Sequence, residues 1–162
     1  MNRATQTVVR NPFDPKTTMG PVASAEHRDK VEHYNPALKR APNLFLGGER
    51  ARNPSLNKSF YVMPTVFTGV TKKMKIYREE ILGPVACIVK FSSEQDVVED
   101  ANDTRYGLCG SVFARNMAKG VRMGNQLRVG SFWVNQHNYS LPNSRGVEAK
   151  KAASTACWDS PS

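Results

Sequence analysis

Regular alternation of apolar and polar positions begins after Tyr61 and predicts an α/β unit. Residues 85–89 read Val-Ala-Cys-Ile-Val, an unbroken apolar run of the kind found in a strand covered on both faces. Residues 110–113 and 131–135 are two further apolar segments that are expected to be strands. Stretches with helical spacing separate the three segments. The order strand–helix–strand–helix–strand predicts a parallel sheet, because right-handed crossovers lay successive strands side by side in one direction.

A capping box marks where the first of the two helices should begin. Ser92 and Gln95 are three residues apart, so each side chain can satisfy an unpaired backbone N–H of the first turn. The helix is expected to end near residues 102–103. The residues expected on its inner face are Val97, Val98 and Ala101.

The second helix is expected to begin after Asn116, a residue that favours the N-cap position, and to continue through Leu127. The residues expected to face inward are Ala118, Val121 and Leu127. Gly120 and Gly124 should weaken this helix by about 1 kcal/mol each relative to alanine.

The first sixty residues are rich in proline, glycine and asparagine and predict mostly loops. One helix should begin with Ser24 as its N-cap. Pro36 leaves two alternatives, because proline lacks the N–H donor and its ring clashes with the preceding turn. Either the helix stops near Tyr34, or Asn35 caps a second short helix with Pro36 at its first position. A short strand is expected at residues 44–46.

Length and composition indicate one ordinary domain without a membrane segment. The chain has 162 residues, of which 40% are hydrophobic. No apolar stretch is long enough to span a bilayer, so no membrane association is expected. The first residues lack the apolar run of a secretory signal, which makes the cytoplasm the expected location. Residues 143–162 show no period and are expected to be a divergent, disordered tail.

The net charge of +9 raises the hypothesis of nucleic-acid binding, which is the least favoured of the functions considered for this sequence. The basic residues are dispersed and no aromatic residues alternate with them, so no nucleic-acid partner is expected. Cys87, Cys109 and Cys157 form no disulfide framework. Cys87 and Cys109 lie in apolar surroundings and are expected to be structural thiols, and no metal site is expected.

The residues alone contain no complete active site. A parallel sheet invites comparison with nucleotide-binding proteins, but the turns between the strands and helices lack the glycines that phosphate binding requires. Ser55-Leu56-Asn57-Lys58 matches a short acyl-enzyme motif without the companion motifs that such enzymes carry. Glu79 and Glu80 read most simply as two solvated charges.

Five segments in the same order resemble the NAD(P)-dependent aldehyde dehydrogenase family. They are Asn11-Pro12-Phe13-Asp14 with Met19-Gly20-Pro21, Tyr61-Val62-Met63-Pro64-Thr65-Val66-Phe67, Arg78-Glu79-Glu80-Ile81-Leu82-Gly83-Pro84-Val85, Ala101-Asn102-Asp103-Thr104-Arg105-Tyr106-Gly107-Leu108 and Trp133-Val134-Asn135. Their character is similar to the betaine-aldehyde and aminobutyraldehyde branches. Residues 1–142 are therefore expected to be the C-terminal part of an aldehyde dehydrogenase catalytic domain.

The resemblance implies an oxidoreductase that oxidises an aldehyde substrate to a carboxylate with NAD or NADP. It implies that Glu80 holds the nicotinamide ribose hydroxyls and that Leu82 lies near the nicotinamide, where the family has phenylalanine. The family's nucleophilic cysteine, its base glutamate and its dinucleotide-binding domain lie upstream of the matching segments. No catalytic residue is therefore assigned, and the isolated chain is expected to be inactive and not to bind the coenzyme alone. The alternative is a non-catalytic partner of full-length aldehyde dehydrogenase subunits.

Overall fold

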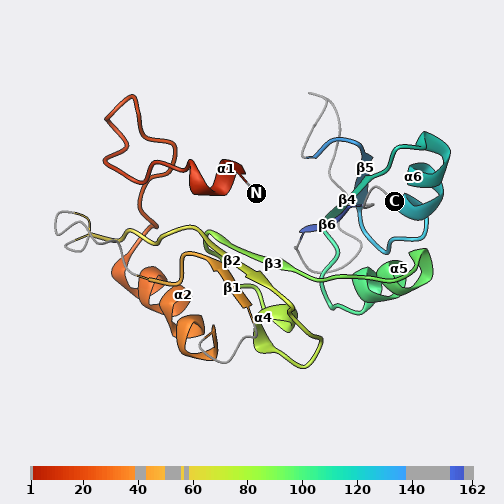
Figure 1. Cartoon of the computed structure of the whole chain (residues 1–162), viewed down its shortest axis with the longest axis horizontal. Helices are drawn as coiled ribbons and strands as arrows, with labels where there is room; N and C mark the ends of the chain where they lie inside the picture. Colours follow the sequence, from red (N-terminus) through yellow and green to blue (C-terminus); the bar gives the residue numbers. More distant parts are fainter. Residues whose placement is uncertain (1, 39–42, 50–55, 57–58, 138–153, 159–162) are drawn as a thin grey trace. The chain divides into compact units, whose positions relative to one another are not determined.

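The computed structural model of the chain describes residues 2–38, 43–49, 56, 59–137 and 154–158 (Figure 1). The chain divides into two compact units, Met1–Lys90 and Phe91–Ser162. Within the described residues, each unit contains one three-stranded sheet. None of the helices in this part of the chain is long and apolar enough to cross a membrane.

The predicted α/β class with parallel strands is confirmed. In the first unit, β2 (Thr65–Thr68) pairs in parallel with β3 (Val85–Ile88) and antiparallel with β1 (Asn43–Leu46). In the second unit, β4 (Cys109–Phe113) lies between β5 (Ser131–Val134) and β6 (Ser154–Trp158), and both pairs are parallel. The expected strand at residues 44–46 corresponds to β1.

The prediction that all three apolar strands share one sheet is wrong for β3. This strand pairs with β2, and the Thr65 amide donates to the Pro84 carbonyl just before β3 begins, at 2.9 Å. The expected cover on both faces is also absent within the described residues, since Ala86 and Ile88 are exposed while Val85 and Cys87 pack against the core. The reason is that the core of the first unit packs against one face of β3 only.

β6 lies within residues 143–162, for which the sequence pattern indicated no regular structure. It pairs with β4 from Cys109↔Ser154 to Phe113↔Trp158. These five residues differ from the expected disorder because backbone hydrogen bonds to a neighbouring strand can order a segment that has no hydrophobic period. The other residues of the predicted tail lie outside the described part of the chain.

The core of the first unit forms between its sheet and two helices, α2 (Ala25–Leu38) and α4 (Lys75–Arg78). A further short helix, α1, spans Asn2–Thr5. Phe67 of β2 and Val31 of α2 are almost completely buried. The buried residues of this cluster are Val31, Val62, Phe67, Val70, Ile76 and Ile81.

Helix α2 begins as predicted but follows neither of the two alternatives for its C-terminal part. The Ser24 hydroxyl accepts from the His27 amide at 3.1 Å, which confirms the N-cap. The helix continues through Pro36 to Leu38, so both the stop near Tyr34 and the restart at Asn35 are wrong. Pro36 lies close to the C-terminal end and removes one helical donor only, so the last turn persists.

In the second unit, α5 (Glu94–Asn102) begins one residue later than the predicted capping box. The Ser93 hydroxyl accepts from the Asp96 amide at 3.1 Å, whereas the Gln95 side chain donates to Glu99. Ser93 is the cap because its extended backbone directly precedes the first helical residue. The predicted inner face is confirmed: Val97 is buried, and Val98 and Ala101 pack against the same cluster.

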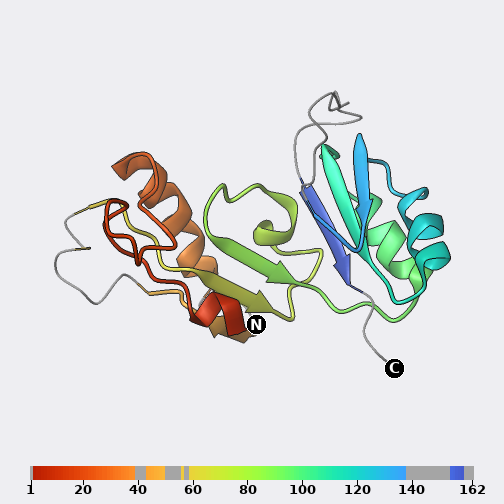
Figure 2. The same cartoon turned by 90° about the horizontal axis from the view of Figure 1, so that it is seen from above.

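Helix α6 (Met117–Gly124) is capped by Asn116 as predicted, with the Asn116 side chain accepting from the Lys119 amide. Figure 2 shows α5 and α6 on the same face of the second sheet. The helix ends at Gly124, and Leu127 is buried just beyond it. The predicted inward orientation is wrong for Ala118 and Val121, which are both exposed.

Two glycines occupy the buried face of α6 instead. A Cβ atom at Gly120 would lie 2.5 Å from Val134 Cγ1, and one at Gly124 would overlap the Phe132 ring. These glycines therefore let the helix backbone approach β5 closely. Their packing role outweighs the loss of helix propensity that the sequence pattern indicated.

We expect Gly124→Ala to destabilise the chain by about 1–3 kcal/mol because the added methyl group overlaps Phe132. Helix propensity alone predicts the opposite sign, a gain of about 1 kcal/mol. Urea unfolding measures the difference. The matched control is Ala118→Gly at an exposed position of the same helix, which should lose about 1 kcal/mol. A stabilised Gly124→Ala variant would contradict the packing argument.

Candidate functional site

Segment 79–84 connects α4 to β3 and contains Glu80 and Leu82, the two residues singled out by the sequence resemblance. The first anchor of the segment is Ile81, whose side chain is buried in the core of the first unit. The second anchor is Gly83, where a Cβ atom would lie 2.7 Å from Val31 Cγ2 of α2. With Ile81 and Gly83 directed inward, the residue between them, Leu82, is directed outward.

The two adjacent glutamates of the segment have different surroundings. The Tyr34 hydroxyl donates to Glu79 Oε2 at 2.9 Å, and Lys75 Nζ lies 4.0 Å from Glu79 Oε1. Within the described residues, the half-buried Glu80 carboxylate has no hydrogen bond or ion pair. A carboxylate in this state has all its acceptor positions available, which suits it to bind the hydroxyl groups of a sugar.

Leu82 has two features that distinguish it from its neighbours. Its side chain is 60% exposed, and its backbone has a φ of 55°, in the left-handed region that costs a residue with a Cβ atom about 1–2 kcal/mol. The Leu82 carbonyl accepts a hydrogen bond from His27 Nε2 of α2 at 2.5 Å. The segment is thus held in a conformation that Leu82 would not favour by itself.

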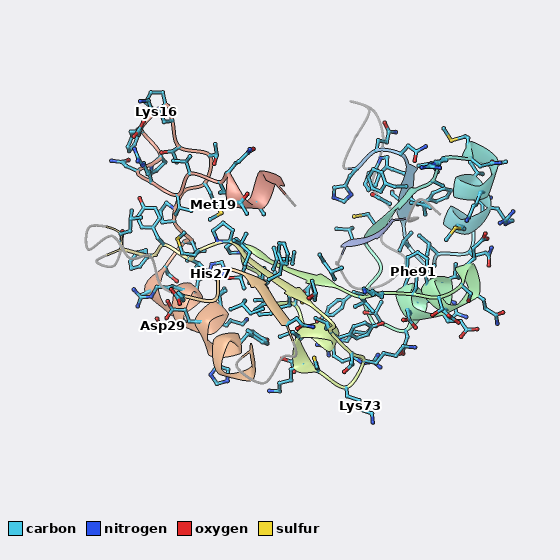
Figure 3. All side chains as sticks on the ribbon, in the orientation of Figure 1. Lys16, Met19, His27, Asp29, Lys73 and Phe91 are labelled. Atoms are coloured by element: carbon cyan, nitrogen blue, oxygen red, sulfur yellow. The ribbon has the colours of Figure 1, made fainter. Side chains whose placement is uncertain are left out.

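The contribution of α2 to this site was not predicted from the sequence. The His27 ring lies beside Leu82, and Figure 3 shows His27 near the N-terminal end of α2. The spacing of His27, Val31 and Tyr34 was the available signal, because residues four and three apart lie on one side of a helix. Within the described residues, no group of three or more potential metal ligands occurs.

Cys87 and Cys109 are poor nucleophiles. Burial raises the pKa of the Cys87 thiol to about 11, and the thiol donates to the Ile76 carbonyl at 3.5 Å. Burial also raises the pKa of Cys109. Because the thiolate is the reactive form, a raised pKa lowers the fraction of each thiol that can react at neutral pH. Their predicted structural role agrees with these surroundings.

We expect alkylation of Cys87 by iodoacetamide to accelerate about tenfold per pH unit from roughly pH 7 to pH 10 without levelling off, because the thiolate fraction keeps rising below the raised pKa. Peptide mapping by mass spectrometry gives the rate for each cysteine. The urea-unfolded chain is the control, and its rate should level off above about pH 9. A plateau near neutral pH in the folded chain would refute the assignment of Cys87 as a buried thiol.

A second polar cluster lies in the second unit. Ser111 Oγ and His137 Nδ1 are 2.6 Å apart, and the Trp133 ring stands edge-on to His137 with the centroids 5.8 Å apart. A serine–histidine pair can generate a nucleophile, but Ser111 is 0% exposed and cannot reach a substrate. The histidine therefore satisfies a buried hydroxyl group.

A family model described as "Aldehyde dehydrogenase family" matches residues 1–147. The chain is 40% identical over 141 residues to the betaine aldehyde dehydrogenase of Bacillus subtilis (strain 168), covering 86% of this chain and 29% of that protein. It is 41% identical over 131 residues to the enzyme of the same name from Mesorhizobium japonicum, covering 80% of this chain and 27% of that protein. The chain thus spans less than a third of the length of these curated relatives.

Solved structures give the same result. A betaine aldehyde dehydrogenase from Staphylococcus aureus in complex with NAD+ is similar with a TM-score of 0.83 and 35% identity, over 91% of this chain and 30% of that one. HpcC from Thermus thermophilus is similar with a TM-score of 0.84 and 37% identity, over 93% of this chain and 30% of that one. The described fold therefore corresponds to a part of each of these longer proteins.

Proposed function

The chain belongs to the aldehyde dehydrogenase family, and from this membership we propose that it is part of an oxidoreductase that converts aldehydes to carboxylates with NAD+ or NADP+. The family match over residues 1–147 carries this proposal. The proposed domain is the C-terminal part of the catalytic domain, residues 1–142. The names of the two curated relatives make betaine aldehyde the first substrate to examine.

We assign the coenzyme contact to segment 79–84. Glu80 would accept hydrogen bonds from the nicotinamide ribose hydroxyls, because its carboxylate has no protein partner within the described residues. Leu82 would offer an exposed aliphatic surface to the nicotinamide. When bound, the coenzyme supplies the acceptor for the hydride of the aldehyde. Within the described part of the chain no cation pairs with the Glu80 carboxylate, which fits this role.

A chimeric enzyme tests the assignment of Glu80. The matching part of the B. subtilis betaine aldehyde dehydrogenase is replaced by residues 1–142 of this chain, and Glu80→Gln is introduced. We expect the KM for NAD+ to rise about ten- to a hundredfold, because hydrogen bonds to a charged group are worth roughly 1.5–3 kcal/mol.

The matched control is Glu79→Gln in the same chimera. The amide oxygen of the introduced glutamine can still accept from the Tyr34 hydroxyl, so the KM for NAD+ should stay within about twofold of the unsubstituted chimera. Equal effects of the two substitutions would contradict the assignment of Glu80 to the coenzyme.

The 162-residue polypeptide by itself should not turn over aldehydes or bind NAD+ tightly. The reaction requires a cysteine thiolate as nucleophile, and the pKa values of Cys87 and Cys109 are raised by burial. We expect no NADH or NADPH absorbance above background with a panel of aldehydes that includes betaine aldehyde. Turnover that disappears in a Cys87→Ala or Cys109→Ala variant would overturn this prediction.

A second candidate function is a non-catalytic partner of full-length aldehyde dehydrogenase subunits. Large apolar side chains exposed on the first unit favour it. Phe13 is 93% exposed at the tip of a loop in which Asn11 Oδ1 accepts from the Phe13 amide and Asp14 Oδ1 accepts from the Lys16 amide. Phe45 of β1 is 50% exposed. An exposed aromatic side chain on a loop held by its own hydrogen bonds is suited to anchor a protein interface.

Co-purification with a full-length subunit tests this candidate. If Phe13 is an anchor, Phe13→Ser should weaken the association at least about tenfold, because a well-packed aromatic anchor is worth more than about 1–2 kcal/mol. Pro15→Ser, at an exposed position of the same loop, is the control. Monomeric behaviour of the chain in the presence of a full-length subunit would exclude this role.

A further inference from the structure

One face of α2 contacts three points of segment 79–84. His27 Nε2 is 2.5 Å from the Leu82 carbonyl oxygen, Val31 packs against Gly83, and the Tyr34 hydroxyl is 2.9 Å from Glu79 Oε2. The three helix residues are separated by four and three positions, which places them in one row along the helix. Together they hold the backbone and one side chain of the segment on both sides of Glu80.

The contact made by His27 differs from the other two because it acts on the backbone of the residue with a positive φ. Leu82 is one of two described non-glycine residues in the left-handed region. A carbonyl oxygen can only accept a hydrogen bond, so the His27 ring must carry a proton on Nε2. The ring is itself placed by the first turn of α2, where the His27 amide donates to the Ser24 side chain.

We propose that His27 is a positioning residue for the coenzyme segment. Its hydrogen bond to the Leu82 carbonyl stabilises the left-handed conformation of Leu82, and this conformation fixes the directions of the Leu82 and Glu80 side chains. The importance of this geometry for the coenzyme rests on the proposed function of Glu80 and Leu82. The hydrogen bond and its effect on φ can be tested without the coenzyme.

A purely structural alternative assigns no such role to His27. Ile81 is buried and Gly83 packs against Val31, so these two anchors could impose the left-handed conformation between them. In that case the His27 ring would form its hydrogen bond to the Leu82 carbonyl without stabilising the left-handed conformation. The two accounts differ in what happens to the φ of Leu82 when the donor alone is removed.

NMR of the 162-residue chain separates the two accounts. The Leu82 backbone is followed through the strong intraresidue amide–Hα contact and the carbonyl carbon shift that mark a positive φ. The ring nitrogens of His27 report which of them carries the proton. The variants are His27→Leu, which removes the donor, and His27→Gln, whose side-chain amide reaches about as far as Nε2. The control is His33→Leu, because His33 is an exposed histidine of the same helix.

We expect wild-type His27 to be protonated on Nε2 and to show a coupling across the hydrogen bond to the Leu82 carbonyl. His27→Leu should lose the positive-φ signature and raise the exchange rate of the amides of residues 81–83 about tenfold. His27→Gln and His33→Leu should retain both properties. A retained signature in His27→Leu, a lost one in folded His27→Gln, or a wild-type ring without a proton on Nε2 would overturn the proposal.

The wild-type ring measurement and the His27→Gln variant remain decisive if His27→Leu fails to fold. A different result would show that the proposed function of Glu80 is wrong while the proposal for His27 holds. If Glu80→Gln leaves the KM for NAD+ of the chimera unchanged while His27→Leu abolishes the Leu82 signature, then His27 positions the segment but the segment does not bind the coenzyme.

Discussion

The close packing of Gly83 against Val31 is the constraint on which the candidate site depends. No side chain larger than hydrogen fits between segment 79–84 and α2 at this point, since a Cβ atom would lie 2.7 Å from a Val31 methyl group. Together with the burial of Ile81, this contact anchors the segment on either side of Leu82. Between these two anchors, the hydrogen bond from His27 to the Leu82 carbonyl stabilises, in our proposal, the left-handed conformation in which the Leu82 side chain is exposed.

The two adjacent glutamates of this segment have different chemistry because they meet different side chains. Glu79 directly follows α4 and meets both Tyr34 and Lys75, so its carboxylate is already occupied by the protein. Glu80 is one residue further along and has no partner within the described residues. The Glu80 carboxylate is thus the one of the two that is available to the coenzyme in our proposal.

Contacts between residues close together in the chain could be predicted from the sequence, whereas packing between separate elements could not. The caps Ser24 and Asn116 were predicted because a capping bond joins residues three apart in the chain. Gly124 was misjudged as a weakness because its partner, Phe132, belongs to another element. The pairing of β3 with β2 was missed for the same reason. The role of Glu80 came from family resemblance, and its solvated appearance gave no reason to prefer it over Glu79.

A crystal structure of the chimeric enzyme with bound NAD+ is the most direct measurement of the central claim. The account predicts that the Glu80 carboxylate lies within hydrogen-bond distance of the nicotinamide ribose hydroxyls, with Leu82 in the left-handed conformation and its carbonyl bound to His27. A Glu80 side chain paired with a protein cation, or a coenzyme that does not contact segment 79–84, would contradict it.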